Sequence, residues 1–266
     1  MHHFFVTREQ IQQDEIVITG PDVNHIRSVL RMRPGQQIRV SDGRQREYLC
    51  SLEQLEPDRV LARILSETEG ETELPARITL LQGLPKGDKM ELIVQKAVEL
   101  GAFEVVPLAM ERSVVKLDAR KAEARIRRWN GIAESAAKQS GRVRVPQVTP
   151  VMTVREALDY VQDAAWKLLP YENARGMESM KEALEQMEPG CRIAVWIGPE
   201  GGFEETEVEQ GLTAGFRTVS LGRRILRTET AGLAALSILM FWLEAGAFRS
   251  GTGSEKERER DHGSIF

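Results

Sequence analysis

The spacing of apolar and polar residues along the chain changes near residue 70. Before that point apolar and polar residues alternate, as in residues 37–43, which run into an Asp-Gly turn, and again in residues 45–55. Alternation on both sides of a tight turn predicts a β-hairpin. Residues 59–66 predict another strand, and Pro21-Asp22 marks the start of a short helix. Residues 1–70 are therefore predicted to form a β-rich domain.

After an acidic stretch at residues 66–75, which ends in proline and is the best linker in the chain, strands alternate with helices. The expected strands are residues 78–84, 103–109, 165–169, 192–197 and 218–221, and the expected helices are residues 88–101, 122–139, 154–161, 177–187, 204–214 and 228–243. This alternation predicts an α/β domain, residues 75–248, with a mostly parallel sheet and helices on both faces. Residues 249–266 mix glycine, serine and alternating charges and predict a flexible charged tail.

Composition narrows the protein class. Of the 266 residues, 41% are hydrophobic and 29% charged, as in soluble globular proteins. The longest apolar run, residues 231–243, is too short to span a bilayer, and the amino terminus lacks the pattern of a secretory signal. The two cysteines and four histidines have neither disulfide nor metal-ligand spacing. We therefore expect a cytoplasmic protein without a membrane segment or a metal.

Charge is distributed unevenly. The net charge is −4, yet residues 111–145 hold ten basic and four acidic residues, a local charge of +6. All nine basic residues of the first domain are arginines, whose forked guanidinium groups suit phosphates. A basic patch on an acidic protein suits a nucleic-acid backbone, although a solvated helix face explains the same charges equally well.

Two glycine loops are the most specific chemical feature. Gly198-Pro199-Glu200-Gly201-Gly202 follows one apolar strand, and Leu221-Gly222 follows the next. Because ligands of open α/β sheets bind at the carboxyl ends of strands, two such loops predict one small-molecule pocket with walls made of backbone. Two ordinary strand-to-helix turns are the simpler alternative. The chain contains neither G-x-G-x-x-G nor G-x-x-x-x-G-K-[ST], which disfavours a dinucleotide dehydrogenase or an NTPase.

Three motifs carry a resemblance to a known family. They are LPKGDKMELIVQKAVELG at residues 84–101, IGPEGG at residues 197–202 and LGRRILRTETA at residues 221–231. In this order and spacing they resemble the RsmE family, bacterial enzymes that methylate N3 of a uridine in 16S ribosomal RNA near the decoding site. The resemblance extends from Arg27-Ser28-Val29-Leu30-Arg31 to the last long helix.

The resemblance implies a fold and partners. Residues 1–70 would be a PUA-like β-barrel that binds RNA, and residues 75–248 a SPOUT methyltransferase domain whose chain is threaded as a trefoil knot. The cofactor would be S-adenosylmethionine, the substrate 16S ribosomal RNA of the small subunit, and the assembly a homodimer. Alternatives are another SPOUT enzyme, one that methylates the ribose 2′-hydroxyl, and a non-enzymatic RNA-binding factor of ribosome assembly.

The same resemblance assigns the cofactor site. Glycines would let backbone approach the cofactor, while Leu221, Ile225 and Leu226 would pack against its adenine. The expected cofactor-binding residues are Leu169, Gly198, Pro199, Glu200, Gly201, Gly202, Leu221, Gly222, Ile225, Leu226, Arg227, Thr228 and Ala231.

Uridine N3 carries a proton at neutral pH, so catalysis needs a base or a group that stabilises the anion. The candidates beside the motif loops are Glu200, Glu229, Arg112 and Arg227. Helix capping by Thr228 and a helix-dipole role for Glu229 compete with catalysis, and we favour them. The expected RNA-binding residues are Arg27, Arg31, Arg33, Arg44, Arg46, Arg112, Lys116, Arg128 and Arg142.

Overall fold

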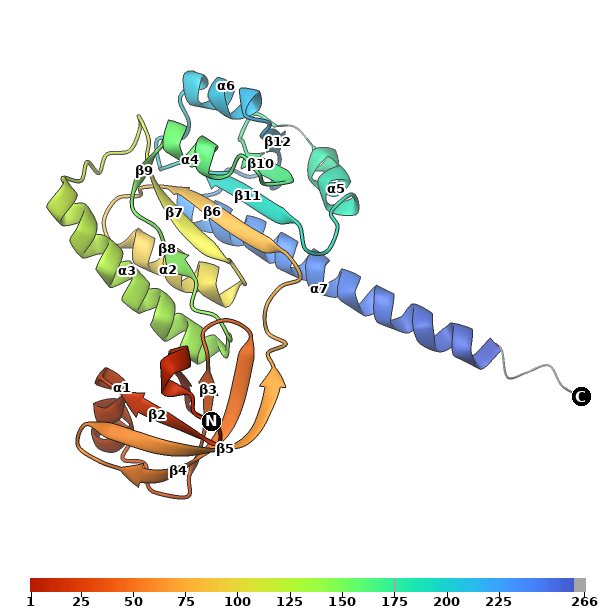
Figure 1. Ribbon diagram of the computed structural model, residues 1–266. Helices are drawn as coiled ribbons and strands as arrows, with labels where there is room; N and C mark the ends of the chain where they lie inside the picture. Colours follow the sequence, from red (N-terminus) through yellow and green to blue (C-terminus); the bar gives the residue numbers. More distant parts are fainter. Residues whose placement is uncertain (175, 261–266) are drawn as a thin grey trace, which may run out of the picture. The chain divides into compact units, whose positions relative to one another are not determined.

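The computed structural model describes the backbone of residues 1–174 and 176–260, with side chains as far as residue 246. Contacts divide the chain into two compact units. The first unit contains Met1–Glu73 and Glu134–Val145. The second contains Leu74–Ala133 and the chain from Pro146 onward. Figure 1 shows the ribbon of both, coloured along the sequence.

The first unit is built on a five-stranded sheet. Its strands, in spatial order, are β1 (His3–Phe5), β3 (Gln37–Ser41), β4 (Arg46–Leu55), β5 (Arg59–Glu69) and β2 (Glu15–Thr19). Three short helical segments join it: η1 (Arg8–Gln10), α1 (Pro21–Asn24) and η2 (His25–Val29). The predicted hairpin is confirmed as β3–β4. The carboxylate of Asp42 holds its turn by accepting hydrogen bonds from three following amides, including that of Arg44 at 2.8 Å.

Alternating residues of these strands form the core of the first unit. Ile16, Ile38, Cys50 and Val60 are fully buried, because every second residue of a strand points to the same face. Burial raises the pKa of the Cys50 thiol to about 12. Cys50 is therefore a core residue and not a nucleophile.

Helix α3 (Ala119–Ser140) ends in the first unit, where ion pairs hold the chain that follows it. Lys138 Nζ lies 2.9 Å from an Asp22 carboxylate oxygen and 2.8 Å from one of Glu134. The Arg142 guanidinium forms an ion pair with Glu73. By its contacts, Glu134–Val145 belongs to the β-rich unit. The domains expected from the sequence, residues 1–70 and 75–248, are each continuous and place this segment in the second domain instead.

The second unit is built on a parallel sheet. In spatial order its strands are β12 (Arg217–Val219), β10 (Trp166–Pro170), β11 (Arg192–Ile197), β6 (Arg77–Gly83), β7 (Glu104–Ala109) and β8 (Gln147–Val148), and β9 (Met152–Thr153) also pairs with β7. The predicted α/β fold with a mostly parallel sheet is confirmed, because every pairing of this sheet is parallel.

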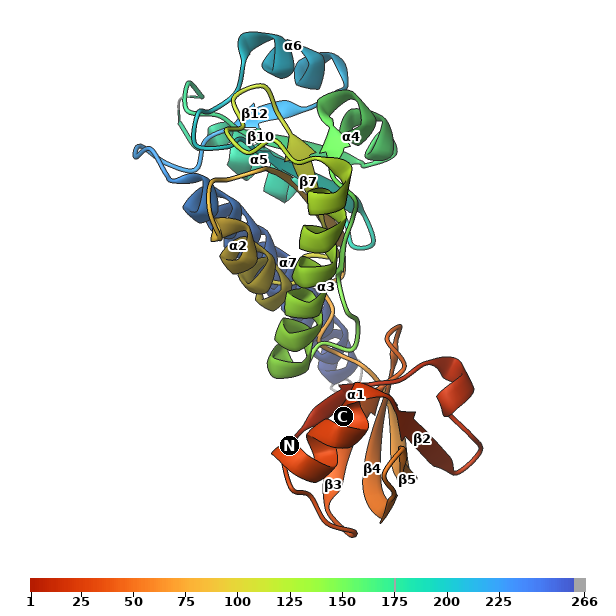
Figure 2. The same cartoon turned by 90° about the vertical axis from the view of Figure 1, so that its left-hand side faces the viewer.

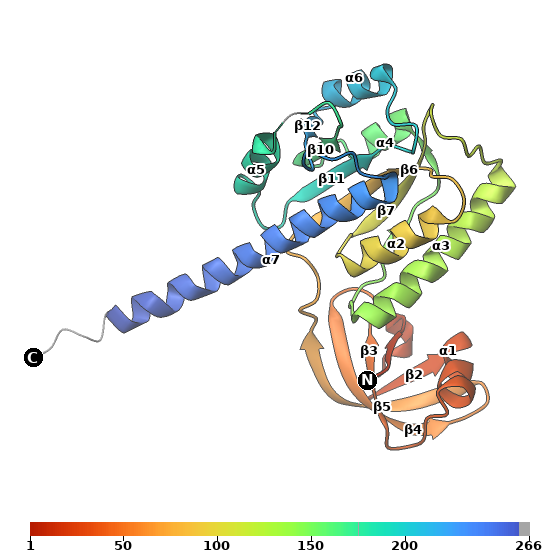
Figure 3. The same ribbon diagram turned by 180° about the vertical axis from the view of Figure 1, so that it is seen from behind.

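Helices cover both faces of this sheet. They are α2 (Lys89–Glu99), α3, α4 (Val154–Tyr160), α5 (Glu178–Glu185), α6 (Glu205–Thr213) and α7 (Thr228–Arg260). Helices α2 and α7 run side by side along one face (Figure 3), and α4 and α6 lie over the other (Figure 2). On the α4 and α6 face, Trp196 packs edge-on against Phe203 and Phe216, with ring centroids 5.3 and 5.5 Å apart.

Helix α7 begins where the second glycine loop ends. Its apolar stretch buries Leu236 and Leu239 against the sheet, as the sequence predicts, while Phe241 is 69% exposed. The helix continues to Arg260, and residues 261–266 lie outside the described part of the chain. The flexible tail expected at residues 249–266 stays a prediction, as does the trefoil knot. No described helix is both long enough and apolar enough to cross a bilayer.

Candidate functional site

A cavity of about 400 Å³ lies in the second unit, where β10 and β11 end and the chain turns into α7. Its walls are the segments 170–172, 197–203 and 220–228, closed by Lys89 of α2 and Ala231 of α7. The three segments follow the carboxyl ends of three adjacent parallel strands, which is where ligands of open α/β sheets bind. The two glycine loops therefore contribute to one pocket.

Most of the residues expected from the sequence line this cavity. They are Gly198, Pro199, Glu200, Gly202, Leu221, Gly222, Ile225, Leu226, Arg227, Thr228 and Ala231. Leu169 does not line it, because it is fully buried in the core beside Trp196. Gly201 does not line it either. A Cβ on Gly201 would lie 2.9 Å from Cβ of Arg112, so this glycine packs on the Arg112 loop.

Several lining residues were not expected. They are Lys89, Tyr171, Glu172, Ile197, Phe203 and Ser220, whereas Pro170, Arg223 and Arg224 lie in segments that the resemblance assigns to the pocket. A signal existed for Tyr171 and Glu172, since residues just after a parallel strand reach the ligand edge of the sheet. Arg223 and Arg224 stand within the LGRRILR motif itself. Lys89 stands within the motif at residues 84–101, but its sequence does not show that it reaches the glycine loops, because Gly198 is 109 residues further along the chain.

Close backbone approach places β6 directly against Pro199, which lines the cavity. A Cβ on Gly83, at the end of β6, would lie 2.6 Å from the backbone nitrogen of Pro199 and 2.7 Å from its Cδ. Only glycine lets β6 and the first glycine loop come this close. Gly222 has φ of 114°, a conformation that a residue with a Cβ adopts only with strain.

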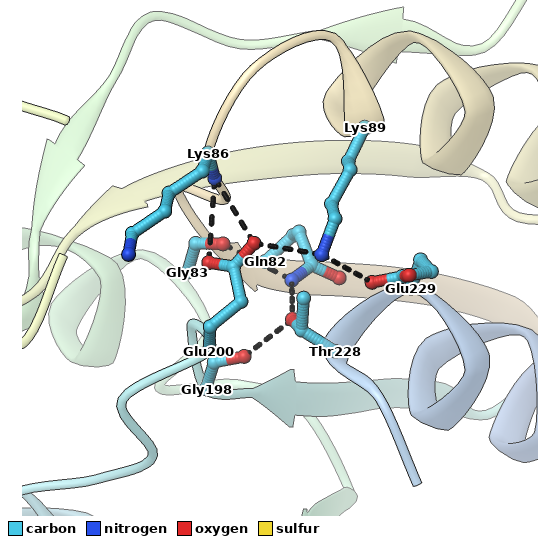
Figure 4. Close-up of polar contacts among 8 residues, drawn as sticks. All are labelled: Gln82, Gly83, Lys86, Lys89, Gly198, Glu200, Thr228 and Glu229. Carbon is cyan, nitrogen blue, oxygen red and sulfur yellow. Dashed lines mark hydrogen bonds and ion pairs between the residues drawn. The ribbon is translucent and has the colours of Figure 1, made fainter. Parts of the chain in front are cut away.

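Thr228 joins three segments that are far apart in the sequence (Figure 4). Its hydroxyl donates to the Gly198 carbonyl at 2.6 Å and accepts from Gln82 Nε2 at 2.9 Å. Gln82 Nε2 also donates to the carbonyl of Gly83 at 3.1 Å. Both hydrogen bonds of the hydroxyl are made to residues outside α7, and neither is made to a backbone amide of that helix. The capping role expected for Thr228 is therefore corrected. It fastens the first glycine loop to β6 and α7.

Lys89 bridges two carboxylates at the cavity (Figure 4). Its Nζ lies 2.9 Å from Glu200 Oε1 and 3.2 Å from Glu229 Oε2. The backbone N–H of Lys86 also donates to Glu200, at 3.1 Å. Burial acts to raise the pKa of Glu200, but the hydrogen bonds from Lys89 and Lys86 outweigh it and lower that pKa overall. The bonds to Glu200 and Glu229 raise the pKa of Lys89.

These contacts separate the four catalytic candidates. A carboxylate with a lowered pKa is a weak base, so the geometry favours a positioning role for Glu200. Glu229 lies in the first turn of α7 beside Lys89, where the helix dipole favours a negative charge. Arg112 binds Glu204 at 2.7 Å and the Gly201 carbonyl at 3.2 Å, outside the cavity lining. Arg227 is exposed and lines the cavity.

The RNA-binding candidates fall into three groups. In the first unit, Arg27 and Arg33 line a second hollow of about 420 Å³. The side chains of Arg31, Arg44 and Lys116 are exposed. Three more are ion-paired: Arg46 with Glu67, Arg112 with Glu204, and Arg128 with Glu91 at 2.8 Å.

The RNA-binding role expected for Arg142 is corrected by the structure. It is 3% exposed and forms an ion pair with Glu73 inside the first unit, so RNA phosphates cannot reach it. Part of the basic patch is therefore structural. No group of three metal-ligating side chains occurs among the residues that the structure describes.

Comparisons with known proteins agree with this geometry. An RNA methyltransferase domain model matches residues 72–240, and an RNA methyltransferase PUA domain model matches residues 18–65. Ribosomal RNA small subunit methyltransferase E of Bacillus subtilis is 40% identical over 250 residues, which is 92% of this chain and 98% of that protein. The protein of the same name from Synechocystis is 31% identical, over 92% of this chain and 78% of that protein.

A solved structure extends the match to three dimensions. The small-subunit methyltransferase E of Neisseria gonorrhoeae, bound to S-adenosyl methionine, superposes with a TM-score of 0.78 and 37% identity. The match covers 91% of this chain and 97% of that one. The PUA domain match thus lies within the first unit, and most of the methyltransferase domain match lies within the second. The chain belongs to the ribosomal RNA small subunit methyltransferase E family.

Proposed function

We propose that this protein transfers a methyl group from S-adenosylmethionine to N3 of a uridine in 16S ribosomal RNA of the small subunit. One observation carries the proposal. Two glycine loops and Thr228 enclose a single cavity at the carboxyl ends of the parallel strands, in a chain of this family. The runner-up within the fold is methylation of a ribose 2′-hydroxyl, for which the described residues supply no separate observation.

The cavity fits S-adenosylmethionine in size and chemistry. About 400 Å³ is within the usual range for small-molecule pockets. Tyr171, Phe203 and Leu226 offer apolar and aromatic surface to an adenine, and the two glycine loops offer backbone donors and acceptors. When bound, the cofactor supplies an electrophilic methyl group. The residues of the cavity bind and aim it, because positioning supplies much of the rate of a displacement at carbon.

Methylation of uridine N3 displaces its proton, which passes to solvent water. The proton leaves more easily when the ring oxygens, which take up negative charge, face a cation. Arg227 is exposed at the cavity and is our candidate for this role. Glu200 and Glu229 hold Lys89 in place and are assigned to positioning. Arg112 braces the loop that carries Gly201.

We assign RNA binding to the exposed arginines of the first unit, which include Arg27, Arg31, Arg33 and Arg44. The match of the PUA domain model to residues 18–65 supports this assignment. The homodimer and the cytoplasmic location that the family resemblance implies stay predictions.

Nucleoside analysis tests the proposal. Small subunits from cells that lack this protein are incubated with the purified protein and labelled S-adenosylmethionine, and the digested RNA is analysed by mass. We expect label in a base-methylated uridine. Label in a ribose would instead indicate the 2′-hydroxyl reaction. If calorimetry detected no binding of the cofactor or of its demethylated product, a non-enzymatic assembly factor would be the better interpretation.

Lys89 provides a sharper test of the site. Lys89→Met should weaken S-adenosylmethionine binding by about tenfold, because it leaves two neighbouring carboxylates without the cation between them. Lys89→Arg should recover most of the affinity. Lys96→Met is the matched control, since Lys96 lies on the same helix and pairs only with Glu99 among the described ion pairs. Equal affinities of Lys89→Met and wild type in calorimetry would exclude the positioning role.

A further inference from the structure

Three arginines stand at the mouth of the cavity on the loop between β12 and α7. Arg223, Arg224 and Arg227, which we call the arginine rim, all line the cavity and are all exposed. Within the described part of the chain, none of the three guanidinium groups makes an ion pair or a side-chain hydrogen bond. Three unneutralised cations therefore lie within five consecutive residues.

The arginine rim differs from those surface arginines that a neighbouring acid neutralises. In these a carboxylate lies beside the guanidinium, as in the pairs Arg39–Glu47, Arg46–Glu67, Arg59–Glu56, Arg63–Glu53, Arg112–Glu204, Arg128–Glu91 and Arg192–Asp163. Other exposed arginines, such as Arg8, Arg120 and Arg155, also have no ion pair among the described residues, but they do not line the cavity. Two acids line the cavity among the described residues: Glu200 is bound to Lys89, and Glu172 forms no ion pair with the arginine rim. In a chain of net charge −4, clustered and unpaired cations indicate an anion from outside the protein.

The cofactor does not account for this charge. S-adenosylmethionine carries a sulfonium, an ammonium and one carboxylate, so it is itself a net cation. One carboxylate occupies at most one of three guanidinium groups. An RNA strand brings consecutive phosphates, and arginine binds each with two parallel hydrogen bonds.

We propose that Arg223 and Arg224 bind the RNA phosphates on either side of the target nucleotide, an inference that rests on the proposed function. These contacts hold the strand across the mouth of the cavity. Arg227 is left facing the target ring, where its proposed role lies. The first unit and the arginine rim then bind different stretches of one RNA.

The exposure of Ile225 is a second observation that favours a nucleic-acid strand at the mouth of the cavity. Its side chain is 85% exposed, although it lies between two cavity-lining residues, Arg224 and Leu226. N3 lies on the pairing edge of uridine, so the base must leave its partner before N3 can enter a pocket. An apolar side chain beside phosphate-binding arginines can pack against the base next to the displaced one. Ile225 is thereby assigned to that neighbouring base.

Salt-dependent RNA binding tests the arginine rim. We would measure the affinity of wild type, Arg223→Gln, Arg224→Gln and the double variant for a 16S RNA fragment spanning the decoding region, at several salt concentrations. Each single variant should bind about fivefold to tenfold more weakly, and the slope of log affinity against log salt should fall by about 0.7 for each arginine removed. Calorimetry should give an unchanged affinity for S-adenosylmethionine.

A control variant shows whether any loss of RNA binding is specific to the arginine rim, and several outcomes would overturn the proposal. Arg155→Gln removes an exposed arginine of α4 that is outside the cavity lining, and should leave both the RNA affinity and the salt slope unchanged. An unaltered slope in the double variant would overturn the proposal. So would a loss of cofactor affinity without a loss of RNA affinity, which would assign the arginines to the cofactor carboxylate. If wild type itself failed to bind the cofactor, the proposed function would fail and not the arginine rim alone.

Discussion

Gly83→Ala should weaken S-adenosylmethionine binding by about 10-fold to 100-fold. The added methyl group would lie 2.6 Å from the backbone nitrogen of Pro199 and 2.8 Å from Sδ of Met110. The sulfur can move, but the backbone of Pro199 can retreat only if the first glycine loop moves with it. Overpacking of this kind costs about 1–3 kcal/mol, and a loop that moves to relieve it no longer fits the cofactor. Calorimetric titration of the cofactor measures the loss.

A second alanine substitution controls for the loss of a glycine as such. In Gly131→Ala the new Cβ would have no atom within 4 Å, because Gly131 lies on an open side of α3. This variant should bind the cofactor like wild type and be at least as stable, since alanine favours a helix. A folded Gly83→Ala protein with wild-type affinity would show that the distance between β6 and Pro199 does not control the pocket.

Thr228→Val should destabilise the second unit and impair the pocket together. Valine has the shape of threonine without the hydroxyl, so the buried Gly198 carbonyl loses its donor and Gln82 Nε2 loses one of its two acceptors. A buried polar group left without a partner costs about 1–3 kcal/mol. We therefore expect the free energy of unfolding to fall by about 2 kcal/mol or more, and cofactor affinity to fall by about tenfold. Urea unfolding and calorimetry measure the two effects.

Two variants of the same helix turn make this test specific. Thr228→Ser keeps the hydroxyl and should recover most of both quantities. Thr230→Val makes the same chemical change at an exposed position two residues away and should alter neither by much. If Thr228→Val and Thr230→Val behaved alike, Thr228 would have no special role in joining the loops.

Local patterns revealed much of the fold. The alternation of apolar strands and amphipathic helices identified β6, β7, β10, β11 and β12 of the parallel sheet but not the two-residue strands β8 and β9, and the Asp-Gly turn identified the β3–β4 hairpin. Alternation does not give the spatial order of strands. The order β12-β10-β11-β6-β7-β8 places β6 beside β11, although more than a hundred residues separate them. Such neighbours depend on tertiary packing, which periodicity does not record.

The same distinction applies to the candidate site. Both glycine loops were visible because their residues are consecutive. The contact of Lys89 with Glu200 joins residues 111 positions apart and had no local signal. Arg142 shows the opposite failure, because a count of charges could not reveal that Glu73 neutralises it in the interior. Site residues that are consecutive in the sequence could be predicted, whereas contacts between side chains from distant segments could not.

The hydroxyl of Thr228 has a consequence for how the protein is made. It fastens together residues that lie 146 positions apart, and the last of the three segments to leave the ribosome is the start of α7. A nascent chain that ends before Thr228 already contains every strand of the parallel sheet but lacks two residues of the cavity, Thr228 and Ala231. Because synthesis runs from the amino terminus, the closed cavity can form only after Thr228 and Ala231 have emerged. A chain terminated before Thr228 is therefore expected not to hold the cofactor.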